Sequence, residues 1–127
     1  MTYPAVLLDK DGRISAMNQR AAEKTETTSP DHVTGLLWSQ LWPSEIEEII
    51  DQSVRDAAMC GKADLTAGCR AGPGDGVILD MEITARDGLI FVTMSDATEA
   101  WRRGDRPQAH VARSLRIGRL YAMQRVA

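Results

Sequence analysis

The feature that most constrains this chain is a pair of Asp-Gly steps, each set between two short apolar runs. They are Asp11-Gly12, between residues 5–8 and 13–17, and Asp87-Gly88, between residues 77–84 and 89–94. A tight turn between antiparallel strands needs positive φ, which glycine adopts without a Cβ clash. The flanking runs are rich in branched apolar residues, which favour strands. The sequence therefore predicts two β-hairpins, one at the start of the chain and one in its last third.

The clearest helix between these hairpins is expected to begin at Ser44. Ser44-Glu45-Ile46-Glu47 has the spacing of a capping box, in which the first and fourth side chains satisfy two free backbone N–H groups. Apolar residues then recur every three or four positions on one side: Ile46, Ile49, Ile50, Val54, Ala57 and Ala58. Gly61 is a natural C-terminal stop. We expect a helix over 44–60 that lies across a sheet by its apolar side.

Shorter elements complete the expected fold. Asn18 is placed to cap a short helix over about 19–25, and 32–43 has the spacing of a short amphipathic turn. Residues 63–70 are strand-like, and the Gly- and Pro-rich stretch 71–76 predicts a turn. The economical arrangement is an α+β fold with a five-stranded antiparallel sheet and helices on one face.

Composition and charge divide the chain near Trp101. A chain of 127 residues is long enough for one domain with one modest hydrophobic core. Residues 1–100 carry a net charge of −9, whereas 101–127 carry +6. No apolar run is long enough to span a membrane and no signal peptide is recognisable, so we expect a cytoplasmic protein without a membrane partner. Cys60 and Cys69 are too few for a disulfide framework or a metal site, and we expect free thiols.

The basic tail predicts a helix over 108–127 with one apolar seam. Val111, Leu115, Gly118 and Ala122 are spaced four, three and four apart. Such a helix gains little in water alone, so it either folds back on its own sheet or pairs with a second copy. We favour a homodimer through these four residues. The arginines of the tail recur every three positions and drift around the helix, which argues against direct contact with nucleic acid.

Several motifs together resemble the PAS domain, a sensory module of bacterial signalling proteins, over about 4–99. They are Asp11-Gly12-Arg13-Ile14 with Asn18 and Ala21-Ala22, Val33-Thr34-Gly35 with Leu41-Trp42-Pro43, Gly61-Lys62, and Asp96-Ala97-Thr98-Glu99. The resemblance implies a PAS fold with a sensor domain at 1–100, followed at 101–127 by a linker and a coiled-coil or signalling helix. It also implies that Asp96, Thr98 and Glu99 form the junction through which a signal leaves the domain.

The tail is similar to the helix that precedes the phosphoacceptor site in PAS-linked histidine kinases. This similarity implies a sensory module that detects a small ligand or a partner and relays the signal to an output domain, foremost a histidine kinase. Two alternatives stay open: the PAS dimerisation module of a DNA-binding transcriptional regulator, and a flavin-binding redox sensor. No phosphate loop, metalloprotease motif or activated nucleophile is present in the sequence, so we expect no catalysis by this chain.

The resemblance also frames the choice of cofactor. Haem PAS domains ligate iron through a histidine on the long helix, and 45–60 contains none. Light-sensing flavin PAS domains need a cysteine on the short middle helix, and 36–42 contains none. Trp38 and Trp42 either flank a non-covalent flavin or belong to the core, which we favour. A third reading is a pocket for a small organic ligand, lined by Trp38, Trp42, Ile50, Val54, Met59, Met81 and Met94.

Overall fold

The computed structural model describes residues 3–25, 27, 29–69, 77–103, 110–117 and 120–126. The turn predicted at 71–76 lies outside these residues. So does Gly118 of the predicted dimer seam, and Val111 is described only by its backbone.

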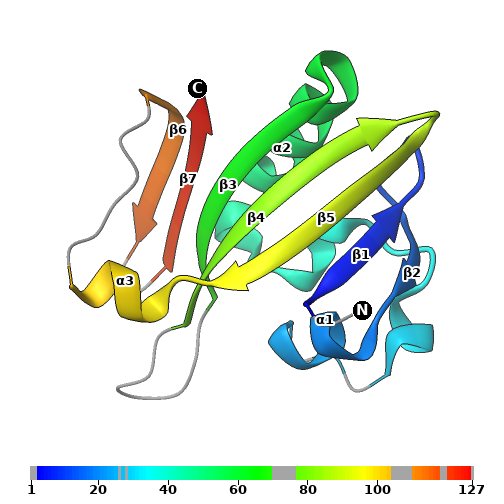
Figure 1. Cartoon of the computed structure of the whole chain (residues 1–127), viewed down its shortest axis with the longest axis horizontal. Coiled ribbons are helices and arrows are strands. Elements are labelled where there is room, and N and C mark those ends of the chain that lie inside the picture. The colour runs from blue at the N-terminus through cyan, green and yellow to red at the C-terminus, as the bar shows by residue number, and fades with distance from the viewer. Residues whose placement is uncertain are drawn as a thin grey trace.

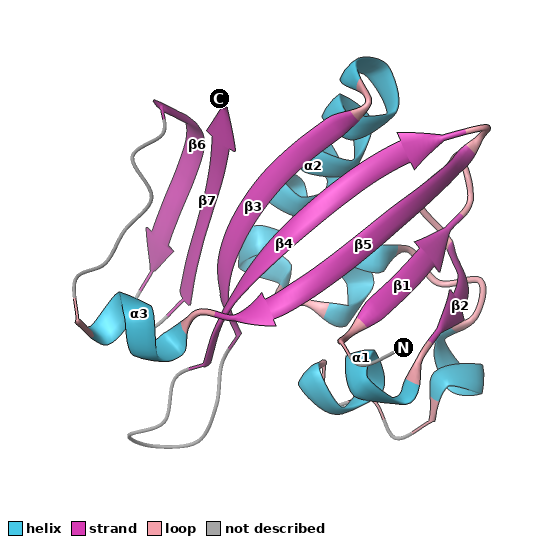
Figure 2. Ribbon diagram, viewed as in Figure 1, coloured by secondary structure: helices cyan, strands magenta, loops and turns pink. Residues whose placement is uncertain are grey.

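The described chain forms one antiparallel sheet of seven strands with its helices around it (Figures 1 and 2). The strand order is β2-β1-β5-β4-β3-β7-β6. The strands are β1 (Ala5–Leu8), β2 (Ile14–Met17), β3 (Lys62–Cys69), β4 (Val77–Arg86), β5 (Leu89–Asp96), β6 (His110–Ile117) and β7 (Leu120–Val126). The helices are α1 (Gln19–Lys24), α2 (Glu47–Cys60) and α3 (Thr98–Arg102), with 3-10 turns η1 (Pro30–Val33), η2 (Trp38–Leu41) and η3 (Ser44–Ile46). The α+β class is confirmed, and the sheet has two strands more than expected.

Both predicted hairpins are confirmed. β1 pairs with β2 across a turn in which Gly12 has φ +84°, and β4 pairs with β5 across Asp87 (φ +54°) and Gly88 (φ +78°). Two successive residues with positive φ give a turn whose twist matches that of the flanking strands. β1 also pairs with β5, which places the two hairpins side by side in the sheet.

Asn18 caps α1 as predicted. Its side-chain oxygen accepts a hydrogen bond from the backbone N–H of Ala21 at 2.9 Å and another from Ala5 at 3.1 Å. The side-chain amide of Asn18 donates to the carbonyl of Tyr3 at 2.9 Å. One side chain therefore caps the helix and also holds the start of β1.

The long helix begins later than its capping-box pattern predicts. Ser44 lies inside the 3-10 turn η3, and Ile46 is the residue that precedes α2, without a side-chain cap. The predicted Ser44–Glu47 box is therefore wrong, because a tighter turn uses the first three residues of the pattern and moves Ser44 away from the cap position. The C-terminal stop is confirmed, since Gly61 has φ +92° and its N–H donates to Ala57 at 2.7 Å.

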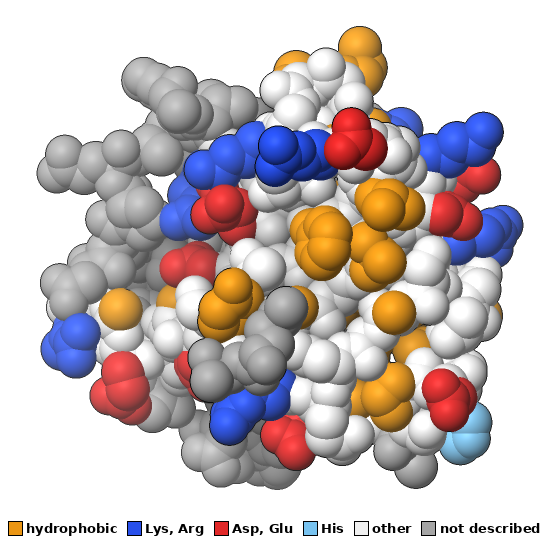
Figure 3. All heavy atoms as spheres, turned by 45° about the vertical axis from the view of Figure 1, so that its right-hand side comes forward, with side chains coloured by type: hydrophobic (Ala, Val, Ile, Leu, Met, Phe, Trp, Pro, Cys, Tyr) orange, Lys and Arg blue, Asp and Glu red, His pale blue; other side chains and the backbone are white. Residues whose placement is uncertain are grey.

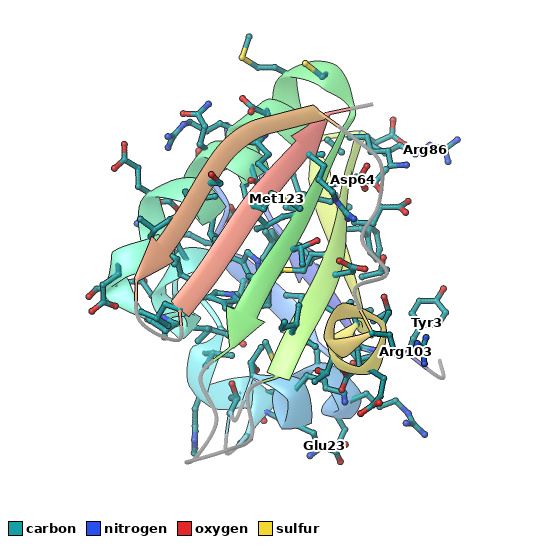
Figure 4. The ribbon with its side chains drawn as sticks, turned by 90° about the vertical axis from the view of Figure 1, so that its left-hand side faces the viewer. Tyr3, Glu23, Asp64, Arg86, Arg103 and Met123 are labelled. Carbon is teal, nitrogen blue, oxygen red and sulfur yellow. The ribbon has the colours of Figure 1, made fainter. Side chains whose placement is uncertain are left out.

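α2 covers one face of the sheet, which we call the inner face. The side chains that α2 buries are Ile49, Ile50, Ser53, Val54 and Ala57. They pack into one core with alternate residues of the central strands, among them Leu65, Leu79, Met81, Ile83, Val92 and Met94. Figure 4 shows α2 on one side of the strands and α3 on the other. The opposite, outer face of the sheet carries the remaining side chains of the same strands.

The tail forms a hairpin, so the predicted helix over 108–127 is wrong. β6 pairs with β7, and β7 pairs with β3 from Asp64↔Arg125 to Gly68↔Tyr121. Ala122 is fully buried, and Leu115 and Leu120 pack against the core from β6 and β7. The helical spacing was misleading because β3 offers an unpaired edge, and tertiary pairing overrides a weak local pattern. Leu115 and Ala122 lie opposite each other within this hairpin, not along a helical seam.

Candidate functional site

Trp38 and Trp42 form a buried aromatic pair. Trp38 begins η2 and Trp42 follows it, so one 3-10 turn separates them. Their rings meet edge to face, with centroids 5.7 Å apart and an interplanar angle of 80°. Trp38 is 1% exposed and Trp42 4% exposed. Both side chains belong to the inner-face core, as we favoured from the sequence.

The first hairpin holds η2 in place through backbone hydrogen bonds. The N–H of Trp38 donates to the carbonyl of Gly12 at 3.0 Å, and that of Ile14 donates to Leu36 at 2.8 Å. The Gln40 side chain accepts from the N–H of Leu37 at 2.8 Å and closes the turn. These contacts explain why the Asp11-Gly12 turn and the tryptophan segment act as one structural unit, although more than twenty residues separate them.

α2 lies directly against this unit. A Cβ placed on Gly12 would come within 3.4 Å of a methyl group of Val54, and η2 packs on α2 and η3. Ile50, Val54, Met81 and Met94 all belong to the same core as the tryptophans. Six of the seven predicted pocket residues are thereby brought into one buried cluster beneath α2, which we call the Trp–Met core: Trp38, Trp42, Ile50, Val54, Met81 and Met94.

The prediction that Met59, the seventh residue, lines the pocket is wrong. Its side chain is 86% exposed at the end of α2. The reason is helical phase, because Met59 lies two residues beyond the buried Ala57 and therefore about 200° around the helix. An apolar residue near the end of an amphipathic stripe does not have to belong to that stripe.

The predicted signal junction is a compact set of hydrogen bonds at the end of β5. The Asp96 carboxylate accepts from the backbone N–H of Thr98 at 2.9 Å, and the hydroxyl of Thr98 accepts from the N–H of Ile78 at 2.9 Å. The N–H of Ala97 donates to the carbonyl of Ile78 at 2.8 Å. The start of α3 is thus bonded to the start of β4. Glu99, also assigned to the junction, is exposed in the first turn of α3.

Asp96 has a further partner that sequence reasoning missed. Lys24, the last residue of α1, lies 3.4 Å from its second carboxylate oxygen. Burial raises the pKa of Asp96, but hydrogen bonds from Thr98 and the charge of Lys24 outweigh burial and hold it below the ordinary 3.8. No local sequence signal links Lys24 to Asp96, which are 72 positions apart.

The outer face of the sheet carries an open polar groove of about 360 Å³, lined by Tyr3, Asp64, Asp80, Met81, Glu82, Thr93, Met94, Ser95 and Arg125. The Thr66 hydroxyl donates to Asp80 at 2.5 Å, and Arg125 lies 3.7 Å from the same carboxylate. Arg125 was missed because the tail was expected to be helical. Farther along this face Leu89 and Phe91 are 42% and 44% exposed, and Figure 3 shows hydrophobic side chains gathered between charged ones.

Comparison with known proteins identifies the family. A sequence profile of the PAS fold family matches residues 2–102. The chain belongs to the PAS fold family. The resemblance seen in the sequence is thereby confirmed, and the PAS match ends at α3, before the β6–β7 hairpin begins. PAS domains are sensory modules.

Solved structures share this PAS fold at low sequence identity. A Vibrio cholera VqmA–ligand–DNA complex aligns with a TM-score of 0.67 at 12% identity, over 87% of this chain and 57% of that one. The PAS domain of the Cronobacter turicensis RpfR quorum-sensing receptor with BDSF aligns at 0.62 and 15%, over 76% and 94%. The PAS domain of a LuxR-family transcriptional regulator from Burkholderia thailandensis aligns at 0.59 and 17%, over 76% and 90%.

This chain matches only about half the length of the VqmA chains. The aligned part of the chain spans 52% of a VqmA chain bound to DPO and 57% of the VqmA chain in the DNA complex. No curated protein sequence matches this chain. None of the described helices combines the length and apolar character needed to cross a bilayer. The comparisons therefore show the PAS fold.

Trp38 and Trp42 are not arranged to hold a flavin between their rings. Because the rings of Trp38 and Trp42 touch each other edge to face, a flat isoalloxazine ring does not fit stacked between them. Among the described residues no group of three or more histidine, cysteine, aspartate or glutamate side chains is arranged to hold a metal ion.

Proposed function

We propose that this chain is a ligand-sensing PAS module of a transcriptional regulator, with its ligand bound in the Trp–Met core. The observation that carries the proposal is the make-up of that core. Two large aromatic side chains and two methionines lie beneath a single helix, and Met81 and Met94 are direct partners across β4 and β5. Methionine is unbranched and adaptable, so it can repack around a guest molecule.

The neighbours support the same kind of function. Their names describe VqmA bound to DPO, and the PAS domain of RpfR in complex with BDSF or with C12:0. These ligands belong to those proteins, and the shared fold is what relates them to this chain. A PAS core that accepts small organic molecules elsewhere is a reasonable place to search for one here.

A transcriptional regulator is favoured over a histidine kinase as the output. The kinase reading rested on a tail helix, and β6 and β7 occupy those residues instead. The neighbours include a VqmA complex with DNA and a LuxR-family transcriptional regulator. We propose a homodimer as well, since one VqmA structure is described as a dimer, without assigning its interface.

Thermal denaturation in the presence of metabolite fractions tests the ligand-sensing proposal. A ligand that binds the folded chain, present at 100 times its Kd, stabilises by about 2.7 kcal/mol. For a domain of this size the transition temperature then rises by about 10 °C. Mass spectrometry of the active fraction identifies the molecule. The matched control is Val54→Trp, which fills the core and is expected to abolish the shift. If no small-molecule fraction raises the transition temperature of the wild-type chain, the proposal fails.

A further inference from the structure

The Trp–Met core contains two hydrogen-bond donors that the protein itself does not use. Among the described residues, the indole Nε1–H of Trp38 has no acceptor and neither has that of Trp42. Both side chains are more than nine-tenths buried. A buried donor without an acceptor costs about 1–3 kcal/mol, so two of them in one core call for an explanation.

Indole can only donate a hydrogen bond, so whatever satisfies these groups must carry an acceptor atom. A third buried donor without an acceptor among the described residues is the guanidinium Nε of Arg125, which lines the groove on the outer face. Two polar side chains buried on the inner side have partners inside the protein. Ser53 donates to the carbonyl of Ile49 at 2.9 Å, and Gln124 donates to Asp56 at 2.6 Å. The two tryptophans differ from them in this respect.

The buried polar residues also indicate that the ligand is uncharged. The buried polar residues among those described are Ser39, Ser53, Thr66 and Gln124, and none of them is cationic. A carboxylate or phosphate taken into this core would be a buried charge without a partner, which is strongly unfavourable. None of these four buried polar residues is acidic either, so a cationic ligand would also be a buried charge without a partner.

We infer that the ligand of this module is a neutral, largely apolar molecule with a carbonyl oxygen or ring nitrogen, bound by the indole N–H groups of Trp38 and Trp42. The inference rests on the proposed function, because it concerns the ligand of the same core. The methionines and aliphatic side chains supply apolar contact, and the tryptophans give the site its polar specificity. A free fatty acid in its ionised form is excluded by this arrangement.

Three probes of similar shape separate the effects of hydrogen bonding, apolar contact and charge on binding. Acetophenone has a neutral carbonyl, ethylbenzene lacks an acceptor, and benzoate is charged. Each is titrated into the full chain labelled with ¹⁵N, and the indole N–H resonances are followed by NMR. Trp38→Phe and Trp42→Phe assign the two signals and remove one donor each. Trp101→Phe, at the third tryptophan of the sequence, is the matched control.

We expect acetophenone to move at least one of the two core indole proton resonances downfield. We also expect about tenfold weaker acetophenone binding in Trp38→Phe or Trp42→Phe, the effect of one lost hydrogen bond, and unchanged binding in Trp101→Phe. Ethylbenzene should bind the wild type and both core variants alike, without an indole shift. The indole shift in the wild-type chain keeps the test valid if a core variant fails to fold.

Two outcomes overturn the inference and leave the proposed function standing. In one, acetophenone binds the wild type and both phenylalanine variants equally and no core indole signal moves. In the other, benzoate binds more tightly than acetophenone. A third outcome, in which no probe perturbs any resonance of the Trp–Met core, overturns the ligand pocket and the inference together.

Discussion

At the scale of single residues, Gln124 shows how β7 is bonded to α2. Its side-chain amide donates to the Asp56 carboxylate on α2 at 2.6 Å, and Gln124 is almost fully buried. A hydrogen bond to a charged group in such a setting is stronger than an exposed one. The bond therefore connects β7 to α2, the helix that covers the Trp–Met core.

Replacing Gln124 by alanine should lower the free energy of unfolding by about 1–3 kcal/mol, because the change removes a buried side chain and its hydrogen bond to the charged carboxylate of Asp56. Gln52→Ala is the matched control, since Gln52 donates to the other oxygen of Asp56 from a half-buried position on α2 itself. We expect that change to cost less than about 0.5 kcal/mol. Urea denaturation measures both. Equal losses in the two variants would contradict the role assigned to Gln124.

Asp96 should make stability depend on pH in the acid range. Its pKa is lowered in the folded chain, so the unfolded chain binds the proton more readily. The stabilisation is complete above the unfolded value of about 3.9 and is lost as the pH falls through the folded value below it. Asp96→Asn should therefore flatten the decline of the thermal transition temperature between about pH 5 and about pH 3.

Lys24→Met provides the control for this titration. It removes the cation beside Asp96 and keeps both hydrogen bonds from Thr98, so the decline should be intermediate between those of the wild type and Asp96→Asn. A pH profile of Asp96→Asn that overlays the wild-type profile would show that the junction carboxylate has no influence on stability.

At the scale of elements, the β4–β5 turn depends on glycine at one position. Gly88 has φ +78°, and no neighbouring atom would meet a Cβ there, so backbone conformation alone sets the cost of a side chain. Gly88→Ala should destabilise by about 1–2 kcal/mol. Gly88→Asn should cost less, because asparagine tolerates this conformation. Chemical denaturation compares the two, and a harmless alanine would mean that the turn rearranges.

The β6–β7 hairpin is expected to contribute to stability as part of the same folded unit. Ending the chain after Arg103 removes Leu115, Leu120 and Ala122 from the core and cuts the Gln124–Asp56 bond. Partial burial of two leucines alone corresponds to about 2–4 kcal/mol. The shortened chain should unfold at a clearly lower urea concentration than the full chain. An unchanged midpoint would mean that the hairpin adds nothing to the fold.

The elements that could be predicted from the sequence are those determined by residues close together in the chain. The two hairpins, the Asn18 cap and the Gly61 stop depend on residues within one turn of each other, and all are confirmed. The hairpin of the tail depends on the free edge of β3, which lies more than forty residues away and leaves no mark on the local pattern. Lys24 and Arg125 were missed for the same reason.

The candidate site was predictable in composition but not in chemistry. The pattern of apolar positions was enough to bring six of the seven pocket residues together, since each belongs to a recognisable element. The sequence could not predict that the indole N–H groups of Trp38 and Trp42 lack acceptors. Tertiary packing decides which acceptor atoms lie near them. Helical phase at the end of α2 explains the one misplaced residue, Met59.

At the scale of the whole molecule, the proposed homodimer is tested with the full chain. Sedimentation equilibrium should give twice the mass of one chain, with dissociation on dilution. Repeating the measurement at low and high salt shows whether charged groups contribute to the association. A monomer mass at every concentration would remove the dimer from the proposal.

The pairing of β7 with β3 also governs how this protein avoids aggregation. β3 is eight residues long and contains no proline, features that make an unpaired strand a template for another chain. With β4 on one side and β7 on the other, β3 never presents a free edge. The strands at the two margins are β2 and β6, and β2 has only four residues. A strand as short as β2 is a poor template for another chain, which opposes the growth of the sheet into a fibril.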